Sequence, residues 1–209
     1  MSSARQPAVP WDQRIARRLV QPLVATAVTP NHLTALSLIV AVLGAGLFAL
    51  GKPGFANWGA VLFVSGRFLD HFDGELARLS GRSSRFGYYF DYVAGALSYA
   101  ALFVGIGVGI ARAGGSVWPY GLAAVGTLAA LSGMLLNLDV DRHSDGGEGD
   151  AVGYPAYAGF ELEDGIYLIA PLTWLGLIKP FFVLAAVGSC LYVVWTLARL
   201  LRMRRAARA

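Results

Sequence analysis

Long apolar stretches, separated by short polar turns, run along most of this chain. The first begins at Pro30 and ends at the turn signal formed by residues 51–54, Gly-Lys-Pro-Gly. Five more stretches follow, at 56–79, 86–112, 117–138, 165–178 and 180–201. About 20 apolar residues in a helix cross the hydrocarbon core of a bilayer. The pattern therefore predicts an all-α integral membrane protein with about six transmembrane helices.

The segment before the first span, residues 11–28, mixes basic and apolar positions at helical spacing. Its basic positions fall towards one side of a helix: Arg14, Arg17 and Arg18. Its apolar positions fall towards another: Ile15, Leu19 and Val20. This spacing predicts an N-terminal interfacial amphipathic helix, with a solvated basic face as the alternative. We expect a single membrane domain over 1–209, with this juxtamembrane helix, a bundle at 30–201 and a basic cytosolic tail at 202–209.

Composition supports a membrane class over a soluble or nucleic-acid-binding one. Hydrophobic residues make up 56% and charged residues 14% of the chain, whereas soluble domains carry about 25% charged residues. The net charge of +4 comes from basic residues beside apolar spans, without a base-recognition motif. We therefore expect a lipid bilayer, and no nucleic acid, as a partner. The single cysteine, Cys190, excludes an intrachain disulfide.

The distribution of basic residues predicts the orientation of the chain. If both termini are cytosolic, all but Lys52, Arg112 and Lys179 of the 17 Lys and Arg residues lie on the cytosolic side. The positive-inside rule favours this arrangement. We expect a protein of a bacterial-type cytoplasmic membrane, in which the turn at 80–85 and the acidic loop at 139–164 are also cytosolic.

The sequence between Asp70 and Gly95 places carboxylates inside apolar helices. Asp70, Asp73 and Gly74 share one helical face. Counted from the turn at 80–85 at 1.5 Å per residue, Asp73 lies level with Asp91, and Asp70 with position 95. With no basic residue expected at that depth, three carboxylates indicate a hard divalent cation, Mg²⁺ or Mn²⁺. The alternative is a proton or ion pathway lined by the same carboxylates.

Basic residues and glycines surround these carboxylates. Arg78, Arg82 and Arg85 stand at the cytosolic rim, either as anion-binding donors or as anchors of the positive-inside kind. Gly74 and Gly87 leave room for a ligand, or permit close helix contacts.

The spacing resembles the signature of the CDP-alcohol phosphatidyltransferase family, D-x2-D-G-x2-A-R-x8-G-x3-D-x3-D. Seven positions match it without a gap: Asp70, Asp73, Gly74, Ala77, Arg78, Gly87 and Asp91. Pro30-Asn31 at the start of the first span is also similar to this family, as is the plan of six spans with cytosolic ends.

The resemblance implies a metal-dependent transferase of phospholipid biosynthesis. It would move a substituted phosphate from a CDP-linked lipid donor, usually CDP-diacylglycerol, to a small alcohol acceptor and release CMP. The implied metal ligands are Asp70, Asp73 and Asp91, holding one or two ions. The implied CDP-binding residues are Asp70, Asp73, Gly74, Ala77, Arg78 and Gly87. The resemblance also implies a homodimer with a cytosolic active site.

One position departs from the signature: Gly95 stands where the family has a final Asp, which resembles a general base. Three interpretations follow. Another acid could replace the base, namely Glu161, Glu163 or Asp164, with Asp164 as the catalytic candidate. The chain could instead be an impaired member that only binds ligands or partners, or glycine could disable an otherwise intact site. An ion- or proton-coupled transporter is the rival from another class.

The acceptor is predicted only by class. A phosphorylated acceptor requires a basic cluster outside the signature, and the acidic loop offers only Arg142 and His143. This favours a neutral or amine-bearing alcohol over an inositol phosphate or glycerol phosphate, with Arg85 as the candidate acceptor contact.

Overall fold

Helices make up most of the structure, a computed structural model that describes residues 11–143, 156–157 and 160–206. The α-helices are α1 (Trp11–Val20), α2 (Pro30–Ala49), α3 (Pro53–Ser80), α4 (Arg85–Gly114), α5 (Trp118–Arg142), α6 (Ile169–Trp174) and α7 (Ile178–Ala206). Two 3-10 helices, η1 (Gln21–Ala25) and η2 (Leu162–Leu168), and one pair of two-residue antiparallel strands, β1 (Ala156–Tyr157) and β2 (Phe160–Glu161), complete the described part. The predicted all-α class is confirmed apart from that small strand pair.

Four of the described helices, α2, α4, α5 and α7, are long and apolar enough to cross a membrane. This confirms an integral membrane protein, but the predicted number of six spans is not confirmed. Although α3 has 28 residues, its second half is polar. The charged residues there are Arg67, Asp70, Asp73, Glu75 and Arg78.

The predicted span at 165–178 is not confirmed, because its helical part ends at Trp174 and is shorter than a membrane-spanning helix. Its first part belongs to η2, and α6 has only six residues. The chain then turns through Gly176, whose φ of 74° is a left-handed conformation that favours glycine and ends a helix. This turn lies close to the predicted boundary between the last two apolar stretches, so the segment before it is shorter than a span and not interrupted by the turn.

The N-terminal helix α1 packs along α3 through a narrow apolar edge. Ala16 and Val20 are fully buried, and Val20 joins Leu33 and Leu76 in a small core cluster. Ile15 and Leu19 are 42% and 55% exposed, so they lie outside this contact. Their insertion into a membrane interface stays a prediction.

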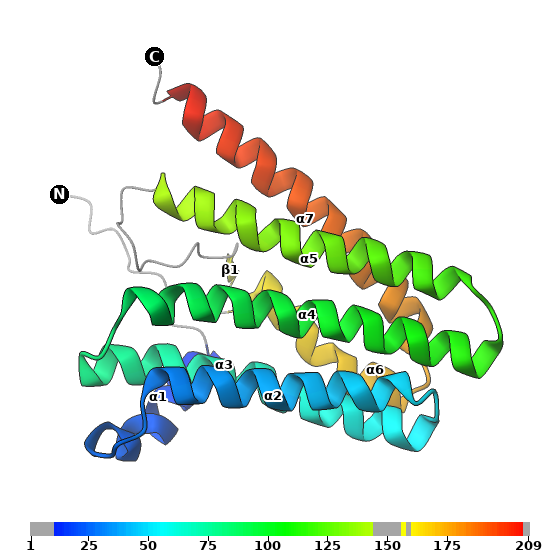
Figure 1. The fold of residues 1–209 in the computed structure, drawn as a ribbon, viewed down its shortest axis with the longest axis horizontal. Coiled ribbons are helices and arrows are strands. Elements are labelled where there is room, and N and C mark those ends of the chain that lie inside the picture. The colour runs from blue at the N-terminus through cyan, green and yellow to red at the C-terminus, as the bar shows by residue number, and fades with distance from the viewer. Residues whose placement is uncertain (1–10, 144–155, 158–159, 207–209) are drawn as a thin grey trace.

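Helices α2, α3 and α4 form the tightly packed part of the bundle, α5 lies against α4, and α7 lies against α5 (Figure 1). Glycines permit the close approach of α2 to its neighbours. A Cβ on Gly44 would lie 2.7 Å from the Gly59 carbonyl oxygen, and one on Gly105 would lie 2.2 Å from the Ala45 carbonyl oxygen. This close packing fixes the relative positions of the three helices that carry the polar residues described below.

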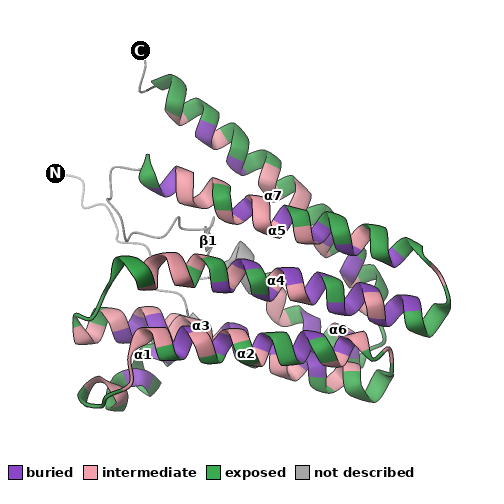
Figure 2. Ribbon diagram, viewed as in Figure 1, coloured by how far each residue is buried: buried purple, intermediate pink, exposed green. Residues whose placement is uncertain are grey.

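Several helix ends and turns lie together at one end of the bundle. The start of α1, the turn between α3 and α4, and the C-terminal end of α7 lie at the same end (Figure 1). Most of the outer surface of α7 is exposed, and its exposed residues are largely apolar (Figure 2). Such a surface suits contact with lipid.

Candidate functional site

Three carboxylates converge between α3 and α4. One oxygen from each of Asp70, Asp73 and Asp91 lies within 4.8 Å of the other two. Asp73 is buried, Asp70 is half-buried and Asp91 is exposed, so the cluster has one open side. The structure thus brings together the three Asp residues that the helical spacing placed on facing surfaces.

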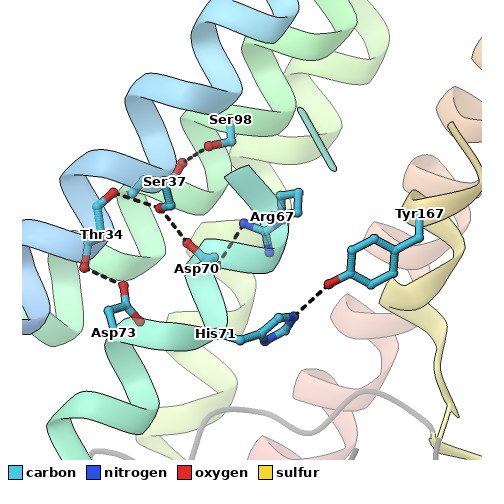
Figure 3. Close-up of polar contacts among 9 residues, drawn as sticks. Thr34, Ser37, Arg67, Asp70, His71, Asp73, Ser98 and Tyr167 are labelled. Atoms are coloured by element: carbon cyan, nitrogen blue, oxygen red, sulfur yellow. Dashed lines mark hydrogen bonds and ion pairs between the residues drawn. The ribbon is translucent and has the colours of Figure 1, made fainter. Parts of the chain in front are cut away.

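Helix α2 supplies two hydroxyl groups to the carboxylates of α3 (Figure 3). The Thr34 hydroxyl donates a hydrogen bond to Asp73 Oδ2. The Ser37 hydroxyl donates to Asp70 Oδ1 over 3.2 Å. Both hydroxyls are buried, so each orients a carboxylate through a contact that water does not replace.

A buried arginine also belongs to this site, contrary to the expectation that no basic residue lies at the depth of the carboxylates. Arg67 Nη1 is 3.0 Å from Asp70 Oδ2, and the Arg67 side chain is only 8% exposed. Its guanidinium carbon lies 5.0 Å from the centre of the Tyr99 ring. The sequence places Arg67 one helical turn before Asp70, where residues three apart meet on the helix surface.

Gly95 lies beside this guanidinium. The nearest atom that a Cβ at position 95 would meet is Arg67 Nη1, at 4.0 Å. Packing therefore does not require glycine here, and the space next to the backbone of α4 faces a positive charge.

The two other predicted glycines have different neighbours. A Cβ on Gly87 would lie 2.8 Å from Asn31 Oδ1, so the absence of a side chain lets Asn31 of α2 approach the start of α4. A Cβ on Gly74 would lie 3.4 Å from Arg78 Nη2. Gly87 thus has a structural role in addition to the predicted ligand contact.

The rim of the site contains an arginine held by a buried acid. Arg78 Nη2 donates to Glu75 Oε1 over 2.7 Å, with the Arg78 side chain 61% exposed and the Glu75 side chain 7% exposed. Glu75 thereby fixes the position of the exposed Arg78 guanidinium. Ala77 is half-buried on the same helix, and Arg85, the first residue of α4, is exposed.

The candidate replacement bases fall in a part of the chain whose side chains lie outside the described residues. Glu161 belongs to β2, and Glu163 and Asp164 belong to η2. The described part of η2 does contact α3, because the Tyr167 hydroxyl and His71 Nε2 are 3.2 Å apart (Figure 3). His71 stands between Asp70 and Asp73 in the sequence, so this contact connects η2 to the carboxylate segment.

Sequence reasoning missed four contributors to the site: Thr34, Ser37, Arg67 and Tyr99. Arg67 had a signal, since an ionisable residue within an apolar helix is costly and usually functional. Thr34 and Ser37 had none that was specific, because Ser and Thr also bond to their own helix backbone. Tyr99 looked like ordinary packing.

The donor set fits a divalent cation. Carboxylate oxygens are the ligands that Mg²⁺ and Mn²⁺ prefer, and a half-buried cluster of three is costly without a cation. The open side at Asp91 would admit a ligand to the cluster.

Comparison with known proteins gives one consistent result. A family profile described as CDP-alcohol phosphatidyltransferase matches residues 27–195. Archaetidylinositol phosphate synthase from Pyrococcus horikoshii is 30% identical over 179 residues, which cover 79% of this chain and 88% of that protein.

Two crystal structures of phosphatidylinositol phosphate synthase from Mycobacterium tuberculosis have the same fold at 23% identity. The structure with CDP-DAG bound has a TM-score of 0.63 and covers 90% of this chain and 94% of that one. The complex with manganese and citrate has a TM-score of 0.60 and covers 90% of this chain and 88% of that one.

Proposed function

Because the chain belongs to the CDP-alcohol phosphatidyltransferase family and is a membrane transferase of phospholipid biosynthesis, we propose that its reaction is metal-dependent and takes place at the Asp cluster. The observation that carries the proposal is the convergence of Asp70, Asp73 and Asp91 within 4.8 Å. These three residues would hold the divalent ion. The ion, when bound, would neutralise charge on the diphosphate of the CDP-linked donor.

The proposed transfer breaks one phosphate bond and forms another. The acceptor hydroxyl oxygen attacks the phosphorus that carries the lipid, the bond from that phosphorus to CMP breaks, CMP leaves, and the hydroxyl proton passes to a base. Arg78, held by Glu75, would bind the CDP phosphates or the departing CMP from the rim. Asp70, Asp73, Gly74, Ala77, Arg78 and Gly87 form the proposed CDP-binding set.

Gly95 cannot accept the proton, so we propose that an acid near η2 does. Asp164 is the candidate, one turn of the 3-10 helix before Tyr167, which contacts His71 of α3. Removal of a general base typically lowers the rate about 100- to 10,000-fold. Asp164→Asn is expected to lower kcat by that order and to leave CDP affinity unchanged.

The direct test is CMP release by the purified chain from CDP-diacylglycerol or an ether-linked CDP-lipid, with Mg²⁺ or Mn²⁺ and with EDTA. Asp70→Asn, Asp73→Asn and Asp91→Asn are each expected to abolish turnover and weaken metal binding. Asp139→Asn is the matched control, because Asp139 pairs with Arg204 of α7 near the C-terminal end of α5 and is not one of the three converging carboxylates. Turnover that persists in EDTA, or in all three variants, would contradict the proposal.

We propose an inositol phosphate as the acceptor. The support is the 30% identical relative, an archaetidylinositol phosphate synthase. This differs from the sequence-based preference for a neutral or amine-bearing alcohol, which rested on the few basic residues outside the signature. A panel of inositol phosphate, glycerol phosphate, ethanolamine and serine separates the two, and CMP release with an amine-bearing alcohol alone would reject the inositol phosphate.

We also propose that the site faces the cytosol and that the protein is a homodimer. The distribution of Lys and Arg supports the orientation, and Arg85 is the proposed acceptor contact at that side. In a Cys190→Ser background, a cysteine at Ser83 should resist a membrane-impermeant maleimide added outside, whereas one at Ser116 should react. The dimer is tested by the mass of the purified protein in detergent.

A further inference from the structure

We infer that the Arg67 guanidinium takes the place of a second divalent cation, so that the carboxylate cluster binds one metal ion per chain. This inference rests on the proposed function, because it assumes that the cluster binds metal. It deepens that function by assigning the number of ions and the role of a residue outside the signature.

Arg67 lies beside one of the three converging carboxylates. Its Nη1 lies 3.0 Å from Asp70 Oδ2, and Asp70 is one of the three converging carboxylates. The same Nη1 lies 4.0 Å from a Cβ built on Gly95, so the guanidinium stands between Asp70 of α3 and Gly95 of α4. Figure 3 shows it on the side of Asp70 that faces away from Asp73.

The charges of the cluster and of Arg67 match one divalent ion. An arginine side chain stays protonated at any physiological pH, so its positive charge is permanent. Metal binding requires ionised carboxylates, and three carboxylates with one guanidinium leave two negative charges. Before the CDP-linked donor binds, one divalent ion neutralises these charges, and a second would leave an excess of positive charge beside the buried side chains of Arg67 and Asp73.

The surroundings of Arg67 hold it in this position. Asp91, Gly95 and Tyr99 follow one another at four-residue intervals on α4, so they share one face. Tyr99 lies against the guanidinium at 5.0 Å, an attractive cation–π arrangement. The Tyr99 ring is itself packed 6.2 Å from the ring of the fully buried Phe63.

Gly95 lies between Asp91 and Tyr99 on that face. Among the described residues outside its own helix, Arg67 Nη1 is the one neighbour that an added Cβ would meet within 4 Å. A carboxylate at position 95 would add the fourth negative charge and a further metal ligand. With glycine at position 95 the cluster has three carboxylates, and Arg67 on the opposite helix reduces their net charge to −2.

The experiment counts Mn²⁺ ions bound to the purified full chain by titration calorimetry and by electron paramagnetic resonance. The natural chain is expected to bind one Mn²⁺ with the spectrum of an isolated ion. Arg67→Lys keeps the charge and should also bind one. The double variant Arg67→Met, Gly95→Asp should bind two ions, whose shared ligands give a spin-coupled spectrum. Gly95→Ala is the control for position 95 and should bind one.

Each result has a distinct meaning. Two ions in the natural chain would overturn the inference and leave the proposed metal-dependent function standing. No bound ion in the natural chain would overturn both. The natural chain could bind one ion, and the double variant could also bind one while keeping its thermal unfolding transition. That result would show that Arg67 does not set the number of bound ions. If the double variant loses that transition, the ion count of Arg67→Lys is the deciding measurement. Two Mn²⁺ ions bound to Arg67→Lys would overturn the inference.

Discussion

The hydroxyl of Thr34 on α2 donates a hydrogen bond to Asp73 on α3, so a helix without any of the three carboxylates orients one of them. Ser37 acts in the same way on Asp70. The site is therefore built by three helices, although the family signature covers only two of them.

Thr34→Val removes this hydroxyl and keeps the shape of the side chain. Groups that orient a metal ligand typically contribute 10- to 100-fold to metal affinity, so the Kd for Mn²⁺ should rise by about that factor. Thr34→Ser should retain most of the affinity. Thr196→Val is the control, because the buried Thr196 hydroxyl bonds only to the Tyr192 carbonyl among its described contacts. Equal Mn²⁺ affinity in Thr34→Val and the natural chain would refute the orienting role.

Arg78→Met should weaken the binding of CDP. A hydrogen bond to a charged group contributes about 1.5–3 kcal/mol, which corresponds to roughly 10- to 100-fold in Kd. Glu75→Gln should have a smaller effect of the same sign, because it releases the guanidinium without removing it. Calorimetry with CDP and Mg²⁺ measures both, with the exposed Arg205→Met at the end of α7 as control. A CDP affinity unaffected by Arg78→Met would remove Arg78 from the nucleotide site.

Gly87→Ala should act through Asn31. The added Cβ would lie 2.8 Å from Asn31 Oδ1, and the side chain of Asn31 can rotate away more easily than the helices can separate. We expect little change in thermal stability and a higher KM for the CDP-lipid. If the loss comes from displaced Asn31, then Gly87→Ala in an Asn31→Ala background should add almost nothing. Additive losses would instead favour direct contact between Gly87 and the nucleotide.

Gly105→Ala should destabilise the bundle. Its Cβ would lie 2.2 Å from the backbone oxygen of Ala45, which cannot move independently of α2. Overpacking of this kind typically costs about 1–3 kcal/mol. Gly46→Ala is the matched control: its Cβ meets nothing within 4 Å, and alanine is favoured over glycine in a helix by up to about 1 kcal/mol. Thermal unfolding in detergent should therefore move in opposite directions for the two variants.

The sequence was sufficient to predict the class of fold and the residues that converge, for a clear physical reason. Helical periodicity fixes which residues share a face, and the short turn between α3 and α4 fixes their relative depth. Asp73 and Asp91 could therefore be placed together without a structure. The same count located Gly95 opposite the polar part of α3.

Two features could not be predicted in that way. The shortness of the helix before Gly176 was missed because hydropathy measures apolar content and not backbone conformation. The contact of Arg67 with Tyr99 was missed because it depends on how two helices approach each other, which depends on glycine contacts spread over α2, α3 and α4. Side-chain pairs between helices need that geometry, whereas pairs within a helix do not.

The polar second half of α3 has a consequence for the biogenesis of the protein. Charged residues near the middle of a helix each oppose insertion through the translocon by roughly 3 kcal/mol, so α3 would insert poorly by itself. It is joined to the apolar α2 by the short turn at 50–52 and contacts it closely at Gly44 and Gly59. We expect α2 and α3 to enter the bilayer together as a hairpin. The charged residues of α3 would thus be retained because a neighbouring helix offsets the cost of their insertion.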